Sequence, residues 1–405
     1  MKKQLLKILN IEPEEAGRVY YLLAMGFFMG IFLATFEVSS FTLFLTNFDE
    51  TKDLPVAIVA SGFVGLILTI LYNFLQSRVR FKFLGLGVLI FITLVILSIR
   101  AGHSLLEDRS MLYYIAFVFA APFGYLSLLV FWGVFGRIFD LRQSKRIIGS
   151  IDTGTLVASI VALFSIPLLL NTMETYNLLV ISLFAAVGYL LMFILIVAKV
   201  NLASINSRDK SVKNAISYRE LFKSRYLVLM SVFVVASMVA ITFIDYSFAH
   251  VATDKYPEEQ NLGTFISYFE ATIVIFSFLF QTFITDKIIE IYGLRISLII
   301  NPLLVALFTV GAILTGTFLG YTAEGNDLFF YFFTAIAASK LFIDSIKDAL
   351  DGPSFKLYFL PVDKNIKFDV QTKIEGVINT FAYLFAGALI LLINEIGIFT
   401  LLHIT

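Results

Sequence analysis

The feature that most constrains this chain is a series of apolar runs, each about as long as a bilayer is thick. A helix needs about 20 apolar residues to cross a hydrocarbon core of roughly 30 Å. The sequence therefore predicts an all-α membrane protein with eleven complete spans, at 19–46, 56–76, 83–101, 111–136, 147–170, 175–198, 225–250, 262–284, 293–318, 327–349 and 370–393.

A further apolar run begins at 396, but it supplies only ten residues, which is half a span. We therefore expect a twelfth helix that is incomplete here, in a natural chain that continues beyond Thr405. That continuation could carry a further C-terminal domain or bind a protein partner.

The composition excludes several classes of protein. Hydrophobic residues make up 59% of the chain and charged residues only 15%, which a water-soluble surface cannot carry. The 30 Lys and Arg balance the 30 Asp and Glu, so nothing indicates a nucleic-acid partner. The partners expected are membrane lipid and a small-molecule solute. The N-terminus shows no cleavable signal.

The residues also give no sign of an enzyme. There is no cysteine, and His103, His250 and His403 are far apart, so we expect no metal site and no cofactor. No phosphate-binding loop of the GxxxxGK[ST] type is present. Energy for transport would then come from a gradient or from exchange.

The basic residues predict the orientation. All but five of the 30 Lys and Arg fall in loops on one side, and such loops stay in the cytoplasm. The opposite loops are acidic. We therefore expect a bacterial cytoplasmic (inner) membrane protein with a cytoplasmic N-terminus.

The longest polar stretch, 199–224, follows six spans and divides the chain. It predicts an N-terminal six-helix bundle (1–198), a cytoplasmic linker and a C-terminal bundle (225–405) of five full spans and the start of a sixth. Six plus six spans is the plan of major facilitator transporters, although helical channels also have six spans per half.

Few charges lie inside the spans, where each costs about 2.5–3.5 kcal/mol. Glu37, Asp245 and Glu270 fall in the outer half of the bilayer and are candidates for a site that binds protons or cations. The alternative is that each hydrogen-bonds a neighbouring helix near the interface. Lys340 and Asp344 share one helix face at i, i+4 and can neutralise each other. Lys340 is also the best candidate for contacting an anionic substrate.

A second group of charges lies at the predicted cytoplasmic ends of the spans. Asp152 and Glu375 occupy equivalent places in the fifth and eleventh spans, each several residues after a cation. We interpret them, with Arg137, Lys145 and Arg146, as a cytoplasmic gate made of structural ion pairs. Such pairs would still differ between the two states of a transporter.

Small residues recur every four positions in two helices, which is typical of close helix packing. They are Gly26, Gly30 and Ala34, and Ser150, Gly154 and Ala158.

Three segments resemble known transporters. VFWGVFGRIFDLRQSKRIIGSIDTGTLVAS (130–159) and DALDGPSFKLYFLPVDKNIKFDVQTKIEGV (348–377) are similar to segments of the nucleotide (ATP/ADP) carrier family, and TDKIIEIYGLR (285–295) resembles a general major facilitator loop. The motifs are degenerate, as in bacterial members. The resemblance implies the fold and a transporter.

The departures from that family oppose ATP or ADP as the substrate. The first span has Glu37 in ATFEVSSFTLF where the family has a basic cluster, and FAYLFAG replaces a Lys-containing turn. A triphosphate needs Arg or Lys to compensate its charge.

Three functions remain open. The leading hypothesis is a secondary transporter that works by alternating access, coupled to protons or cations, with an unassigned substrate. The second is an ATP/ADP antiporter, and the third is a non-transporting membrane subunit or scaffold. A polar, water-filled centre would favour transport, whereas a dry aromatic centre would favour the scaffold.

Overall fold

The structure is a computed structural model that describes residues 12, 15–76, 78–139, 141–199, 217–323, 327–363 and 366–396. Helices account for the secondary structure of this described part, which contains no strand. The predicted all-α class is therefore confirmed.

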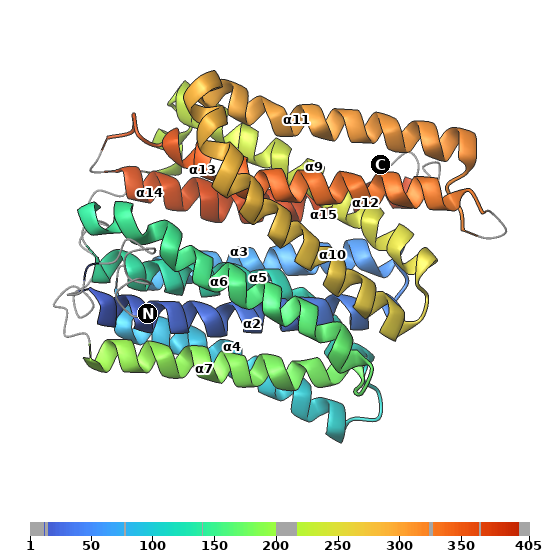
Figure 1. Cartoon of the computed structure of the whole chain (residues 1–405), viewed down its shortest axis with the longest axis horizontal. Coiled ribbons are helices and arrows are strands. Elements are labelled where there is room, and N and C mark those ends of the chain that lie inside the picture. Colours follow the sequence, from blue (N-terminus) through green and yellow to red (C-terminus); the bar gives the residue numbers. More distant parts are fainter. Residues whose placement is uncertain are drawn as a thin grey trace. The chain divides into compact units, whose positions relative to one another are not determined.

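Ten helical segments of the described residues are long and apolar enough to cross a membrane. Three of them are lengthened by π-helical turns, which are η3 (Gln281–Thr285), η4 (Lys347–Asp351) and η5 (Thr372–Ile378). The main helices, shown in Figure 1, are α2 (Ala16–Asn47), α3 (Asp53–Gln76), α4 (Phe81–Leu105), α5 (Ser110–Ile138), α7 (Leu178–Lys199), α9 (Arg225–Lys255), α10 (Glu259–Phe280), α11 (Asp286–Leu319), α12 (Phe329–Ile346) and α15 (Asn379–Ile396).

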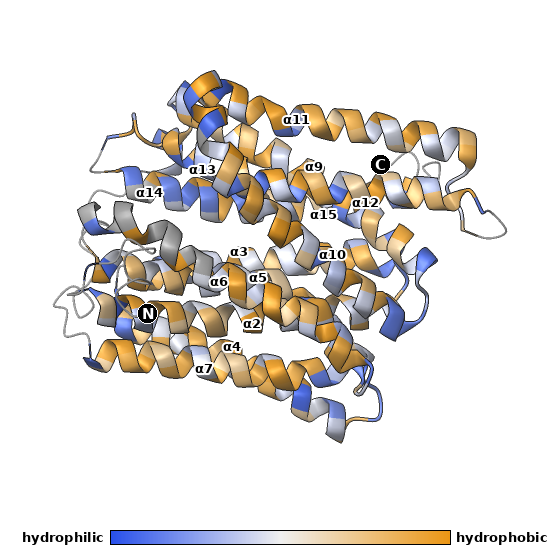
Figure 2. Ribbon diagram, viewed as in Figure 1, coloured by the Kyte–Doolittle hydropathy of each residue, from blue (hydrophilic) through white to orange (hydrophobic). Residues whose placement is uncertain are grey.

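The predicted span 147–170 lies within the helix α6 (Leu141–Leu170). Of this helix, the stretch Gly154–Leu170 is apolar within the described residues. In the other helices, hydrophobic residues dominate most of the length (Figure 2). The predicted half-span 396–405 lies outside the described residues, apart from Ile396 itself.

The chain forms two compact units. The first contains residues 1–44 and 68–210. Its two stripes of small residues pack against each other, because a Cβ at Gly30 would lie 2.6 Å from the Thr155 carbonyl oxygen and 3.2 Å from the Ala158 Cβ. The close packing predicted for α2 and α6 is therefore present.

Aromatic side chains fill the interior of the first unit. The rings of Phe44 and Phe117 stack with their centroids 4.3 Å apart, and Phe36 and Phe123 lie 5.5 Å apart. Such pairs each contribute about 0.5–1.5 kcal/mol beyond the area that they bury.

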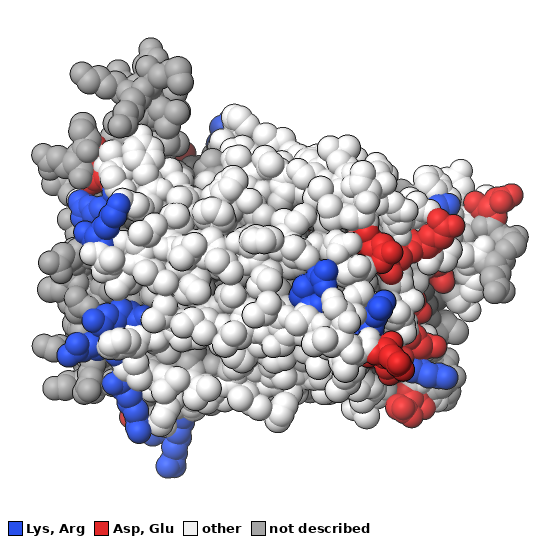
Figure 3. Space-filling model, turned by 90° about the horizontal axis from the view of Figure 1, so that it is seen from below, with Lys and Arg blue, Asp and Glu red and all other residues white. Residues whose placement is uncertain are grey.

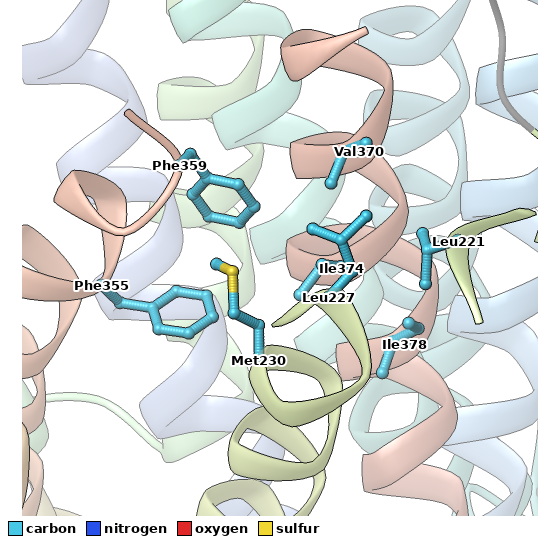
Figure 4. Close-up of a cluster of buried hydrophobic side chains, with 8 residues drawn as sticks. All are labelled: Leu221, Leu227, Met230, Phe355, Phe359, Val370, Ile374 and Ile378. Carbon is cyan, nitrogen blue, oxygen red and sulfur yellow. The ribbon is translucent and has the colours of Figure 1, made fainter. Parts of the chain in front are cut away.

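The second unit contains residues 45–67 and 211–405. At one end of it, α8 (Tyr218–Leu221) is held by a capping box of Ser217 and Glu220. Next to it, two short helices, α13 (Gly352–Leu357) and α14 (Lys367–Gln371), connect the longer ones. An apolar cluster fixes this end (Figure 4), consisting of Leu221, Leu227, Met230, Phe355, Phe359, Val370, Ile374 and Ile378.

Residues 45–67 pack tightly with α15 in the second unit. A Cβ at Gly62 would lie 2.6 Å from the Leu384 Cα, and one at Gly387 would lie 2.7 Å from the Ile58 side chain. The sequence-based division into 1–198 and 225–405 assigns this stretch to the first bundle. The structural units therefore cross that division in α3.

One glycine is required by the backbone itself. Gly293 interrupts α11 with φ of +77°, in the left-handed region that residues with a Cβ rarely adopt. Gly293 belongs to the segment TDKIIEIYGLR. At this residue a kink divides α11 into a short helical part before it and a longer part after it.

We expect Gly30→Ala to destabilise the first unit, because the new methyl group would collide with backbone of α6. Overpacking of this kind costs about 1–3 kcal/mol. The melting temperature of detergent-purified protein measures it. Gly87→Ala in α4 is the matched control, since nothing lies within 4 Å of its added Cβ. Equal effects of the two substitutions would contradict the packing.

Candidate functional site

The deepest charged cluster in the second unit is centred on Lys340 of α12. Its Nζ donates to Asp245 Oδ1 at 2.6 Å and to Asp344 Oδ2 at 2.8 Å. Glu270 Oε1 lies 4.0 Å from the same nitrogen. Asp245 comes from α9 and Glu270 from α10, so one ammonium joins three helices.

The three helices bring these groups to a similar depth. Asp245 lies ten residues before the end of α9, and Glu270 and Lys340 each lie eleven residues after the starts of α10 and α12. At about 1.5 Å rise per residue, each group is about 15–17 Å from those helix ends. The three groups therefore lie at a similar level, well inside helical segments that are apolar enough to cross a membrane.

Within the cluster, the side chain of Lys340 is less exposed to solvent than that of Asp245. The side chain of Lys340 is 12% exposed and that of Asp245 is 39% exposed. Lys340 Nζ also lies 5.5 Å from the ring centroid of Phe248, which adds a cation–π contact. Three carboxylates surround one ammonium, so the charge of the cluster is unbalanced when all are ionised.

This arrangement brings together four of the five residues predicted for the cavity. Asp344 pairs with Lys340 as the i, i+4 spacing predicts, but Asp245 and Glu270 join the same cation. The fifth, Glu37, lies in α2 of the first unit and its side chain is exposed. Its convergence with the other acids stays a prediction.

The residues predicted for the gate are only partly described. Arg137 stacks 3.9 Å from the Phe81 ring centroid and donates to the Gly133 carbonyl at 2.8 Å. Glu375 is half-buried and accepts a bond from Gln371 at 2.7 Å. The side chains of Lys145, Arg146 and Asp152 lie outside the described part.

Sequence reasoning missed a second polar network, which links the turn after α2 to α9 and α15 within the second unit. Thr51 Oγ1 lies 3.2 Å from His250 Nε2, and Asn394 Nδ2 donates to the Thr51 carbonyl at 2.9 Å. Asn394 also donates to the Tyr246 hydroxyl at 2.7 Å. The residues are far apart in sequence and mostly uncharged, so neither spacing nor charge indicates the network.

Glu50, beside this network, is half-buried. Burial raises the pKa of its carboxyl above the ordinary value of 4.5, and the nearby Asp254 and Asp49 add to the rise. A hydrogen bond with Thr253 acts in the opposite direction, but burial dominates.

A groove of about 800 Å³ in the second unit has a different character. It runs between α9, α11 and the η5–α15 segment, and its lining includes Val235, Phe243, Val305 and Phe381. Nearly all of its lining is apolar, which suits lipid or another helix better than a polar solute. Within the described residues, no group of three His, Asp or Glu side chains is arranged to hold a metal ion.

Comparisons with known proteins agree with this architecture. Among solved structures, a mutant of the nucleoside transporter NupG matches with a TM-score of 0.68 at 11% identity, covering 93% of this chain and 91% of that one. A POT family transporter bound to a conjugated peptide gives 0.63 at 14% identity, with coverage of 93% and 91%. The inward-open xylose transporter XylE from E. coli gives 0.55 at 12% identity, with coverage of 94% and 95%.

These likenesses show the major facilitator fold. Residues 199–394 match the model of the TLC ATP/ADP transporter family. No curated protein matches the chain. The comparisons together support a membrane transporter rather than an enzyme. Its C-terminal half is similar to the TLC ATP/ADP transporter family, which confirms the predicted resemblance to nucleotide carriers.

We expect Lys340→Met to lower the free energy of unfolding by about 3 kcal/mol, because it removes the ammonium to which Asp245 and Asp344 are hydrogen-bonded. We expect no larger loss of stability, because the side chain of Asp245 is partly exposed and water can solvate its charge. Chemical denaturation in detergent measures it. Lys255→Met, at the exposed end of α9, is the control. Adding Asp245→Asn to Lys340→Met should restore part of the loss, and no restoration would argue against the pairing.

We expect Glu50→Gln to stabilise the protein near pH 7 and to have little effect near pH 4. Because the folded-state pKa of Glu50 is raised, its contribution to stability is fully present below the unfolded value and is lost as pH rises through the folded value. Melting temperatures across that range test this. Asp108→Asn should show the opposite sign at pH 7, since hydrogen bonds from Ser110 lower the pKa of Asp108.

Proposed function

We propose that this protein is a secondary transporter that moves a small-molecule solute by alternating access, and that the acids around Lys340 couple transport to protons or another cation. The observation that carries the proposal is one mid-helix lysine surrounded by three carboxylates. Ionisable groups at this depth are costly in a bilayer and are kept mainly for function.

The unbalanced charge explains why a cation would bind. Lys340 carries one positive charge, and carboxylate oxygens of Asp245, Glu270 and Asp344 all lie within 4.0 Å of its ammonium. A proton or a small cation that neutralises a second carboxylate lowers the cost of placing the cluster in the membrane. Neutralising that carboxylate also weakens its electrostatic attraction to the Lys340 ammonium. The ion pairs across α9, α10 and α12 would then differ between two states, as a coupled transporter needs.

The polar network at Thr51 supports alternating access. Residues 45–67 come from the first half of the sequence, yet they hydrogen-bond to α9 and α15 of the second half through His250 and Asn394. Separation of the two sequence halves at this end would require these few hydrogen bonds to break. Each contributes only about 0.5–1.5 kcal/mol net, so the contact can be reversible.

The charge distribution supports a cytoplasmic N-terminus in a bacterial inner membrane. On the face shown in Figure 3, the acidic side chains lie mostly toward one end together with a few Lys and Arg, and the other end carries mainly Lys and Arg. The basic end would lie in the cytoplasm.

The family match favours a second candidate, exchange of ATP and ADP. Lys340 argues against it in this chain, because its ammonium already contacts Asp245 and Asp344 at hydrogen-bonding distance. A phosphate chain would have to displace two carboxylates and leave them uncompensated. The proposal therefore assigns a neutral or cationic solute to the site.

Reconstituted protein should take up a neutral or cationic solute from a screened panel, and an inward proton or cation gradient should increase uptake. Glu270→Gln should remove the dependence on the gradient while the protein stays folded, because one of the three carboxylates around Lys340 loses its charge. Glu259→Gln, at the start of α10, is the matched control.

ATP and ADP belong in the same panel. We expect millimolar nucleotide to give no saturable stabilisation, whereas occupancy at 100 Kd would add about 2.7 kcal/mol. A saturable nucleotide shift that Lys340→Met abolishes would replace this proposal with nucleotide exchange.

A further inference from the structure

A second acidic residue lies inside the same unit, away from Lys340. Asp351 is the last residue of η4, and its residue surface is only 6% exposed. Its Oδ2 accepts a hydrogen bond from Asn301 Nδ2 of α11 at 2.7 Å. Asn301 is 3% exposed, so the pair lies in the protein interior. Asp351 follows Lys340 by eleven residues, about 16 Å along a helix.

Three buried oxygens at this place have no hydrogen-bond partner within the described part of the chain. They are Asp351 Oδ1, Asn301 Oδ1 and Ser354 Oγ. Ser354 is fully buried and lies three residues after Asp351, on the same helix face. A buried polar atom left unsatisfied costs about 1–3 kcal/mol, so three together require an explanation.

The local backbone is unusual in the same region. Lys347–Asp351 forms a π-helical turn, closed by the Gly352 amide donating to the Lys347 carbonyl. A second π-helical turn, η3, packs beside it, and Thr285 Oγ1 donates to the Ala349 carbonyl at 2.7 Å. Single π-helical turns inside α-helices occur frequently at functional sites.

The surrounding charges do not neutralise Asp351 by direct contact. Lys347 and Asp348, on the same turn, are the charged residues that act on it most, and their effects oppose each other. From α11, the group that faces it is the uncharged Asn301. The carboxylate is therefore buried with an amide partner and no ion pair of hydrogen-bonding length among the described residues.

We infer that Asp351, Asn301 and Ser354 form part of a binding site for one sodium ion. A carboxylate, an amide carbonyl and a hydroxyl are hard oxygen ligands of the kind that alkali and alkaline-earth cations prefer. One positive charge balances the single carboxylate, whereas a divalent ion would leave an excess charge inside the membrane.

A proton or a water molecule at this place would satisfy fewer of the three buried oxygens than a sodium ion. A proton on Asp351 lets the carboxyl donate one hydrogen bond, which satisfies one acceptor and leaves another unpaired. A water molecule donates two hydrogen bonds but leaves the buried carboxylate charge uncompensated. A sodium ion held by the three oxygens would satisfy each of them and balance the carboxylate charge.

The inference does not depend on the proposed transport activity, because the site is tested by binding alone. If the protein is a cation-coupled transporter, sodium at Asp351 becomes the candidate coupling ion. A failure to find sodium binding at Asp351 would leave the contacts of Lys340 and the Glu270→Gln test of coupled transport as they stand.

The test is thermal unfolding of the purified full chain at pH 8 and constant ionic strength, with sodium chloride replacing choline chloride. We expect a saturable rise in melting temperature with sodium and no saturable rise with potassium. Asp351→Asn keeps the shape of the side chain but should weaken the apparent sodium affinity at least tenfold. Asp348→Asn, three residues earlier and exposed, is the matched control and should retain the response.

Ser354→Ala provides a second variant if Asp351→Asn does not fold, and it should also weaken the affinity for sodium. Two results would overturn the inference. One is the same melting temperature in sodium and choline, which identifies Asp351 as a protonated or hydrated carboxyl. The other is a sodium response that survives both substitutions, which places the ion elsewhere.

Discussion

The constraint on which this structure depends is that a bilayer offers no hydrogen-bond partners to the chain. Backbone groups must therefore bond within helices, and side chains must find partners inside the protein. Most of the hydroxyls do so locally. Thr35 donates to the Ile31 carbonyl, Thr93 to that of Leu89, and Thr242 to that of Met238, each four residues back on its own helix. Other polar groups bond to a neighbouring helix, as Ser182 does to the Phe32 carbonyl and Tyr189 to the Ser127 carbonyl, and the charged members of this class are the functional candidates.

Lys340 is a charged group whose hydrogen bonds connect neighbouring helices. Its ammonium cannot be satisfied by α12 alone, because Asp344 supplies only one carboxylate on that helix. The contact with Asp245 therefore fixes α9 beside α12. In the transporter that we propose, a charged contact of this kind would differ between the two states, because its strength depends on how many of the surrounding acids are ionised.

The sequence predicted those parts of the molecule that depend on length, periodicity or charge. Span length located the helices, i, i+4 spacing paired Asp344 with Lys340, and depth along the helices put Asp245 and Glu270 at one level. It did not predict that 45–67 packs with the second unit, because that depends on shape at Gly62 and Gly387. It also gave no role to Asn301, an uncharged residue fifty positions from Asp351.

Lys340 and Asp351 belong to one continuous membrane segment, Phe329–Leu357, with a π-helical turn at its second site. A π-helical turn contains an extra residue relative to the α-helical pattern, so reverting it to α-helix rotates everything that follows by about 100° relative to the part before it. A ligand that binds Asp351 would favour one of these two backbone states. If sodium binding at Asp351 changed the π-helical turn, it would also change how the part of the segment that carries Lys340 is oriented relative to Asp351. The Lys340 cluster and the Asp351 site would then influence each other through the conformation of the helical segment that carries Lys340 and Asp351.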